Sequence, residues 1–239
     1  MFREGASYIA LDIETTGVRP KRDRIIEIAA IKVREGREEA KYHALIDPKM
    51  SLSEEITGLT GISDEMLRGK PGIEECIADF VNFTEELPLL GHKLLFDYSF
   101  LKRACVNAGI SFEKEGIDTL KLCRALMPEK ERKTLSSACA YFGIETKKAH
   151  RALNDARAVM LLYEKLLEHY SEKNESLFRK TQLIFKIKKE QKASNRQKEY
   201  LRKLLNYHKI MENIELESLT KNEASRLSDR LRAIYGKLK

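Results

Sequence analysis

Two carboxylates stand two residues apart, just after an apolar run near the start of the chain. Asp12 and Glu14 follow Tyr8–Leu11, which predicts a buried strand. Residues two apart in a strand point to the same face, so these side chains would lie together. Such a pair repels, and one member takes up a proton unless a cation holds both. Oxygen ligands suit magnesium or manganese, which predicts a metal site. A strand that ends in the polar turn Thr15–Gly17 is the simpler alternative.

A third carboxylate, Asp97, lies on the apolar face of a predicted helix over residues 97–108. It shares that face with Leu101, Cys105 and Ala108, at offsets of four, eight and eleven residues. Asp is also a favoured helix-capping residue, and this position falls in the first turn of the predicted helix. Both interpretations of Asp97 therefore stay open at this point.

A fourth carboxylate, Asp155, repeats this anomaly on the predicted helix 152–169. It lies between Ala152 and Val159 on the apolar face, at a position where capping does not account for it. An unpaired buried carboxylate is costly, so a salt bridge or a metal must hold it. His150 precedes it by five residues, on the loop that would enter the helix.

These residues together suit one kind of chemistry. Two divalent cations about 4 Å apart need a cluster of carboxylates such as this one, drawn from a strand and two helices. Cations in that arrangement clamp a phosphate and stabilise a leaving oxygen. A histidine beside them can take the proton from an attacking water.

Strands at the start of the chain and strand–helix units after it must position these side chains. Short turns join the first three predicted strands, which indicates an antiparallel meander. Strands followed by strand–helix units predict an α/β fold with a mixed, five-stranded sheet flanked by helices. The predicted strands cover residues 7–13, 24–33, 40–46, 87–91 and 116–119, and helices are predicted near 64–67, 73–81, 97–108, 134–142 and 152–169.

Composition limits the class of protein. The 239 residues are 42% hydrophobic, and no apolar stretch is long enough to cross a bilayer. The first residues show no signal-peptide pattern, and the four cysteines form no C-x-x-C pair, which favours buried free thiols. We therefore expect a cytoplasmic protein.

Charge divides the chain into unequal parts. Residues 171–239 hold 18 Lys and Arg against 9 Asp and Glu, whereas the residues before them are nearly balanced. We predict a domain over 1–170, a basic linker or helix over 171–195, and a small basic all-helical module over 196–239. Within the module, Thr220–Glu223 has the pattern of a capping box. The positive charge of the module fits a solvated helix face, a phosphate-binding tether or a docking surface for a protein such as a polymerase.

Three segments resemble the motifs of a known family. Asp12–Gly17, Gly91–Leu101 and His150–Asp155 are similar, in this order, to the three exonuclease motifs of the DEDDh family. This family includes the epsilon proofreading subunit of bacterial DNA polymerase III. The resemblance covers about residues 5–170. It implies a ribonuclease H-like fold and 3′→5′ exonuclease activity with two Mg²⁺ or Mn²⁺ ions.

The same resemblance implies roles for individual residues. A sister group carries Tyr at the position of Arg151, so the His variant of the family fits and the Tyr variant does not. The second motif usually has Asn after its His, and here that residue is Lys93. Asp118 and Thr119 also recur in the family, as a device that starts a helix. By resemblance, the metal ligands are Asp12, Glu14, Asp97 and Asp155, the general base is His150, and the substrate-binding residues are Thr15, Thr16, Gly17, Leu59, Thr60, Ile62 and His92, with either Leu59 or Ile62 packing against the terminal base.

The resemblance predicts an enzyme that releases nucleoside 5′-monophosphates from a free 3′ end of DNA, in proofreading or repair. One alternative is an RNA-directed exonuclease of the RNase T or oligoribonuclease type. Another is a nucleic-acid-binding module without catalysis, although the complete set of four carboxylates and His150 argues against it. The expected partners are nucleic acid and, through the C-terminal module, a DNA polymerase or another replication or repair protein.

Overall fold

The chain divides into two compact units, Met1–Ile187 and Lys188–Lys239, which we call the first and the second unit. The sequence predicts a first domain that ends near residue 170. The structure places the division later, because the segment after the last long helix of the first unit returns to the sheet. The computed structural model describes residues 6–146, 150–210, 214–217 and 219–238.

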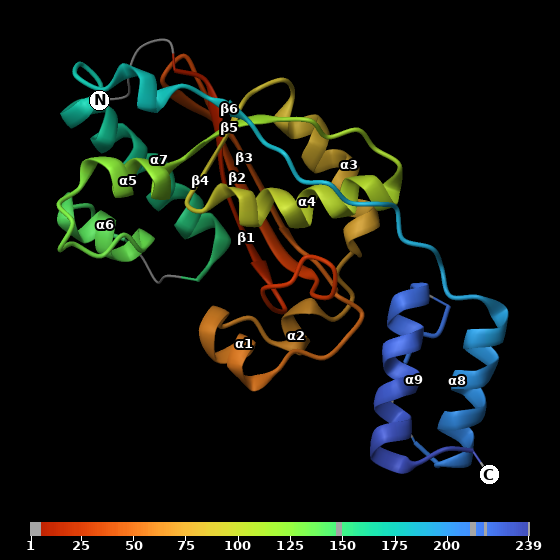
Figure 1. Ribbon diagram of the computed structural model, residues 1–239. Coiled ribbons are helices and arrows are strands. Elements are labelled where there is room, and N and C mark those ends of the chain that lie inside the picture. Colours follow the sequence, from red (N-terminus) through yellow and green to blue (C-terminus); the bar gives the residue numbers. More distant parts are fainter. Residues whose placement is uncertain (1–5, 147–149, 211–213, 218, 239) are drawn as a thin grey trace. The chain divides into compact units, whose positions relative to one another are not determined.

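A mixed sheet forms the centre of the first unit. Within the described residues it has six strands, in the order β3-β2-β1-β4-β5-β6 (Figure 1). β1 lies inside the sheet, antiparallel to β2 and parallel to β4, so hydrogen bonds on both of its edges fix its position. The strands are β1 (Tyr8–Thr15), β2 (Ile25–Arg34), β3 (Arg37–Leu45), β4 (Leu89–Gly91), β5 (Glu115–Asp118) and β6 (Thr181–Gln182).

The sixth strand, β6, corrects the prediction of a five-stranded sheet. Thr181 and Gln182 pair antiparallel with β5 at the edge of the sheet. The N–H of Leu183 also donates to the Lys114 carbonyl at 2.9 Å. A strand of two residues has no hydrophobic alternation, so tertiary contacts create it and the sequence pattern does not indicate it.

Alternate residues of β1 face two different cores. Leu11 packs in a core with helices α3 and α4, whereas Ala10 packs in a core with α5, α6 and α7. Strand periodicity therefore directs Asp12 and Glu14 to the face that α7 covers. The helices of the first unit are α1 (Glu54–Thr60), α2 (Asp64–Leu67), α3 (Ile73–Thr84), α4 (Leu94–Ala108), α5 (Thr119–Leu126), α6 (Leu135–Tyr141), α7 (Ala152–Tyr170) and the 3₁₀ helix η1 (Glu175–Phe178).

The second unit consists of two packed helices, α8 (Asn195–Tyr207) and α9 (Lys221–Tyr235). Each helix begins in a capping box, and the predicted box at Thr220–Glu223 is confirmed. Ile234 of α9 is 63% exposed and lies outside the core of this unit. The small core contains Ala193, Leu201, Leu204, Ala224 and Leu231.

The two helices of this unit run parallel. At one end, the Gln197 side chain near the start of α8 donates to the Lys221 carbonyl at the start of α9, at 3.0 Å. At the other end, the rings of His208 and Tyr235 approach to 5.8 Å between centroids. Just before α9, Thr220 pairs with the segment before α8 through its bridge with Lys192.

Candidate active site

β1 supplies two carboxylates at its C-terminal end. Glu14 is buried and Asp12 is half-buried. The antiparallel register places Glu14 opposite Glu27 of β2. Two acidic residues thus face each other across a strand pair, where like charges are unfavourable unless other groups balance them.

Asp97 reaches β1 from the first turn of α4. Its Oδ1 accepts a hydrogen bond from the N–H of Ile13, the residue between the two β1 carboxylates, at 3.3 Å. α4 begins at Leu94 because Lys93, with a left-handed φ of 69°, forms the N-cap. The alternative that Asp97 caps the helix is therefore wrong. Asp97 is 3% exposed and lies against the end of β1.

Asp155 and His150 come from the start of α7. The helix begins at Ala152, so Asp155 lies in its first turn. The Asp155 Oδ2 accepts a hydrogen bond from the backbone N–H of His150 at 2.7 Å. Arg151, not Asp155, is the N-cap of this helix, and the bond from His150 to Asp155 ties the entry loop to the helix. It also holds His150, whose φ of 61° is left-handed, beside the carboxylate.

The side chains from β1 and α7 converge. Ligand atoms of Glu14, His150 and Asp155 all lie within 4.8 Å of one another. Burial, then the charge of Asp155, raises the pKa of Glu14 to about 8, and burial raises the pKa of Asp97 to about 8. Burial and the charges of Asp97, Glu14 and Asp155 raise the pKa of Asp12. The cluster thus holds more negative charge than its surroundings stabilise, which is typical of a cation site.

Glu27 is a fifth carboxylate beside this cluster, and the sequence analysis missed it. Its Oε1 accepts from Arg151 Nη2 at 3.0 Å and lies 2.7 Å from His43 Nε2. Its Oε2 accepts from the N–H of Ala152, the first residue of α7, at 3.0 Å. Burial alone would raise the pKa of Glu27, but these hydrogen bonds outweigh it and lower the pKa to about 2.

Glu27 therefore joins β2 to the loop that carries His150. Arg151, the residue that follows His150, is held by both oxygens of the Glu27 carboxylate. The available sequence signal was a glutamate inside the apolar run Ile25–Val33, where a buried strand has no room for an unpaired charge.

The turn after β1 is held by its own side chains. Thr15 Oγ1 donates to the Gly17 carbonyl at 2.6 Å, and Thr16 Oγ1 accepts from the Arg24 N–H at 2.9 Å. A Cβ on Gly17 would approach the Asp23 carboxylate to 2.6 Å, so any other residue there would have to displace the Asp23 side chain. The predicted substrate residues Thr15, Thr16 and Gly17 thus build a fixed turn next to the carboxylates.

The structure separates the two candidates for the residue that packs on a terminal base. Leu59 in α1 is 49% exposed, whereas Ile62 is fully buried in a small core with Ile26 and Leu67. Thr60 is also buried, and its hydroxyl donates to the Ile56 carbonyl. Leu59 alone among the three predicted residues of this segment presents a large accessible apolar surface.

His92 is engaged within the protein. Its Nδ1 lies 3.0 Å from Thr119 Oγ1, and its Nε2 lies 2.8 Å from the Lys133 carbonyl. Nearby, the Asp118 side chain accepts from the Leu120 N–H and caps α5, as the sequence predicts for this helix start. His92 thus ties the end of β4 to α5 and to the segment before α6.

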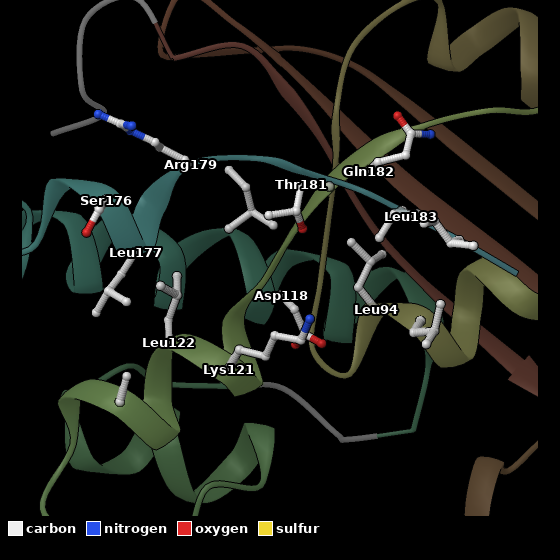
Figure 2. Close-up of a pocket in the computed structure, with 15 residues that line it drawn as sticks. Leu94, Asp118, Lys121, Leu122, Ser176, Leu177, Arg179, Thr181, Gln182 and Leu183 are labelled. Atoms are coloured by element: carbon white, nitrogen blue, oxygen red, sulfur yellow. The ribbon is translucent and has the colours of Figure 1, made fainter.

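A separate groove of about 320 Å³ lies along the β5–β6 edge (Figure 2). Leu94, Leu122, Leu177 and Leu183 give it apolar walls, and Asp118 is the acidic residue in its lining. None of the predicted metal ligands lines this groove. The convergence of Glu14, His150 and Asp155 is therefore a different place on the first unit.

Comparison with known proteins bears on most of the first unit. The model of the RNase T exonuclease family matches residues 9–163, more than half of the chain. The chain belongs to this exonuclease family. The resemblance that its three motifs indicate is confirmed, and every residue of the cluster falls inside the matched range.

Curated relatives of this exonuclease family member include large polymerases. The chain is 38% identical over 173 residues to the "DNA polymerase III PolC-type" protein of Bacillus subtilis, covering 71% of this chain and 12% of that protein. It is 37% identical over 166 residues to the protein of the same name from Thermotoga petrophila, covering 69% of this chain and 12% of that protein. The chain thus spans about an eighth of the length of these relatives.

Solved structures of other exonucleases share the fold. Escherichia coli Exonuclease I in complex with a dT13 oligonucleotide aligns with a TM-score of 0.62 at 20% identity, over 72% of this chain and 43% of that chain. Exonuclease X in complex with 5′ overhanging duplex DNA aligns with a TM-score of 0.56 at 22% identity, over 72% and 97%. The ribonuclease H-like fold is thereby confirmed. No helix among the described residues of this family member is both long and apolar enough to span a membrane.

Proposed function

We propose that this chain is a divalent-metal-dependent 3′→5′ exonuclease that acts on DNA in proofreading or repair. The observation that carries the proposal is the convergence of Glu14, His150 and Asp155 within 4.8 Å in a chain of the exonuclease family. Asp12 and Asp97 adjoin that cluster. The charges of Asp97, Glu14 and Asp155 raise the pKa of Asp12, and the charge of Glu14 contributes to the raised pKa of Asp97. The products would be nucleoside 5′-monophosphates.

The chemistry of the donors fits Mg²⁺ or Mn²⁺. Carboxylate oxygens are the ligands these ions prefer, and the raised pKa values of Glu14, Asp97 and Asp12 indicate negative charge that the described neighbours balance only in part. Asp12, Glu14, Asp97 and Asp155 would hold the metal, for which we propose two ions. When bound, the ions supply charge stabilisation for the scissile phosphate and the departing oxygen.

His150 has the position of a general base. Its imidazole is exposed, so water reaches it, and one of its ring nitrogens lies within 4.8 Å of ligand atoms of Glu14 and Asp155. The oxygen of a water would attack phosphorus, the bond from phosphorus to the 3′ oxygen would break, and the water proton would pass to the imidazole. The hydrogen bond from the His150 N–H to Asp155 and the pairing of Arg151 with Glu27 position the loop for this step.

The relatives favour DNA as the substrate. The curated relatives are named DNA polymerase III PolC-type, and Exonuclease I and Exonuclease X were solved in complex with DNA. A polymerase context for this chain is part of the proposal. The RNA-directed alternative is an outcome of the experiment that follows.

The experiment uses single-stranded DNA and RNA of the same sequence, each labelled at its 5′ end in one set and at its 3′ end in another. With Mn²⁺ or Mg²⁺, we expect 5′-labelled DNA to give a ladder of shortening products and 3′-labelled DNA to release mononucleotide at once. Chelator should abolish both. Faster digestion of RNA would support the RNA-directed alternative, and internal cleavage or a 5′ start would contradict the proposal.

A further inference from the structure

The second unit carries the entire net charge of the chain. Residues 188–239 hold 14 Lys and Arg against 7 Asp and Glu, whereas residues 1–187 hold 30 of each. The family model ends at residue 163, before the second unit begins. A unit of this size with a surplus of seven positive charges attracts polyanions over several ångströms in dilute salt.

Three of the seven acidic side chains of this unit have partners inside it. Glu217 pairs with Lys198 and with Arg202, the latter at 2.7 Å. Asp229 pairs with Arg232, and Glu223 accepts bonds from the Thr220 N–H and hydroxyl, both at 2.9 Å. These acidic groups therefore do not neutralise the remaining cations of the unit.

Three exposed cations gather at one end of the unit. Lys192 is paired through its backbone with Thr220, next to Lys221. The Lys221 N–H donates to the Gln191 carbonyl at 2.7 Å, which fixes the two segments side by side. Arg196 lies in the first turn of α8, whose Gln197 side chain reaches the Lys221 carbonyl. No ion pair joins the side chains of Lys192, Arg196 or Lys221 to any acidic residue that the structure describes.

The apolar exposed residues lie at the opposite end. Tyr207 and Tyr235 are about half exposed, and Tyr235 contacts His208 at the C-terminal ends of the helices. A helix of this length separates its ends by about 20 Å, at about 1.5 Å for each residue. Apolar contact with a protein partner and electrostatic contact with a polyanion would therefore use different ends of the unit.

We propose that the second unit binds the phosphate backbone of nucleic acid through Lys192, Arg196 and Lys221. The partner is the strand whose end the first unit degrades, so this inference rests on the proposed function. Contacts of point charges with phosphates are independent of base sequence. They hold the strand near the first unit between successive cleavages, which raises the effective concentration of its end.

The test measures binding of the full-length chain to a fluorescent 30-nucleotide single strand by anisotropy, at 50 to 200 mM NaCl. Chelator is present, so hydrolysis plays no part and failure of the proposed activity does not affect the result. The triple variant Lys192→Gln, Arg196→Gln, Lys221→Gln should lower the slope of log affinity against log salt by about 2, since each contact contributes about 0.7. Between 50 and 200 mM, the wild-type affinity should fall about 15- to 20-fold more than that of the variant.

Two further variants separate position from total charge and from folding. Lys121→Gln, Lys173→Gln, Arg179→Gln removes three exposed cations of the first unit and should leave the slope unchanged. Lys192→Arg, Arg196→Lys, Lys221→Arg keeps the charges and should keep the slope. An unchanged slope in the first triple variant, or an equal loss in the first-unit variant, would overturn the proposal. If only changes at Tyr207 and Tyr235 weaken binding, the cation end is not the site.

Discussion

The acidic side chains at the end of β1 differ in what balances their charge. Glu27 has a guanidinium, an imidazole and a backbone N–H as partners, and its pKa lies near 2. Burial raises the pKa values of Glu14, Asp97 and Asp12, and neighbouring carboxylates add to the effect. The metal-free site is therefore unstable at high pH by its own charge, and a cation relieves that instability.

Asp97→Asn should make the metal-free protein more stable at pH 8. The Asp97 pKa is raised on folding to about 8, so this carboxyl destabilises the folded state progressively as pH rises from about 4 to 8. Asparagine keeps an acceptor for the Ile13 N–H and removes the charge. We expect a gain of a few kcal/mol at pH 8 in denaturant unfolding, and none at pH 4.

With Mn²⁺ present, the wild type should be more stable than Asp97→Asn at pH 8, because the wild-type site gains metal-binding energy that the variant loses. A wild-type protein that is equally stable with and without Mn²⁺ at pH 8 would argue against a cation site at Asp97. A variant less stable than the wild type without metal would show that the Asp97 charge is already balanced.

At the scale of elements, contacts between β2 and α7 hold the loop that carries His150, the proposed base. Glu27 belongs to β2, yet its partners Arg151 and Ala152 open α7. α7 also packs on β1, so the three elements form one rigid support beneath His150. The side chain of Glu27 thus holds the loop of His150 but lies outside the cluster of Glu14, His150 and Asp155.

Glu27→Gln should destabilise the protein in a pH-dependent way. The folded pKa of about 2 lies below the usual value of 4.5, so the ionised carboxylate contributes stability above pH 4.5, which is lost as pH falls towards 2. A shift of this size corresponds to about 3 kcal/mol, and solvent screening of the half-exposed Arg151 and His43 reduces it to about 2 kcal/mol. Denaturant unfolding should show this deficit at pH 7 and a shrinking one below pH 4.5.

The same variant should lower turnover more than substrate affinity, because the loop of His150 loses its anchor while the carboxylates remain. Glu39→Gln serves as a control on the exposed strand β3, where its ion pair with Arg34 is solvated. A Glu27→Gln protein with wild-type turnover and stability would contradict the positioning role.

Leu59→Ala should change the KM and Ile62→Ala should change the stability of the fold. Leu59 is half exposed, so its loss should leave unfolding unchanged and raise KM for a single strand about fivefold, the worth of about 1 kcal/mol of apolar contact. Ile62 is fully buried, so its loss should cost about 2 to 4 kcal/mol of stability. Measurements of KM and of denaturant unfolding for the two variants check these expectations. A KM effect confined to Ile62→Ala would show that Ile62, and not Leu59, packs on the terminal base.

Patterns along single elements predicted most of the fold. The apolar run Tyr8–Leu11 indicates β1, and the apolar stripe of α7 indicates the helix on which Asp155 lies. Contacts between distant segments left no such pattern. β6 depends on pairing with β5, and α4 begins three residues before Asp97 because of the backbone conformation of Lys93.

The sequence indicated Asp97 and Asp155 as candidate ligands because a charge on an apolar helix face is visible within one element. The role of Glu27 could not be predicted in this way, since its three partners come from β3, from the loop before α7 and from α7 itself. Likewise, the burial of Ile62 and the exposure of Leu59 depend on how their segment packs on β2.

At the scale of the whole molecule, the chain combines a neutral first unit with a basic second unit. All three cores of the first unit consist of residues before Lys188, so this unit has what it needs to fold alone. A chain that ends at Ile187 should unfold cooperatively and turn over saturating DNA at the wild-type rate, with a higher KM. Steady-state kinetics at several salt concentrations check this, and loss of turnover at saturation would tie the second unit to the chemical step.

The central claim is that the carboxylates around β1 and α7 form a metal-dependent exonuclease centre. The most direct measurement is the rate of nucleotide release from single-stranded DNA by wild type, Asp155→Asn and Asp79→Asn in the presence of Mn²⁺. Asp79 is an exposed carboxylate of α3 outside the cluster. We predict wild-type release by Asp79→Asn and a loss of about two to three orders of magnitude in a folded Asp155→Asn. Equal release by all three proteins would contradict the account.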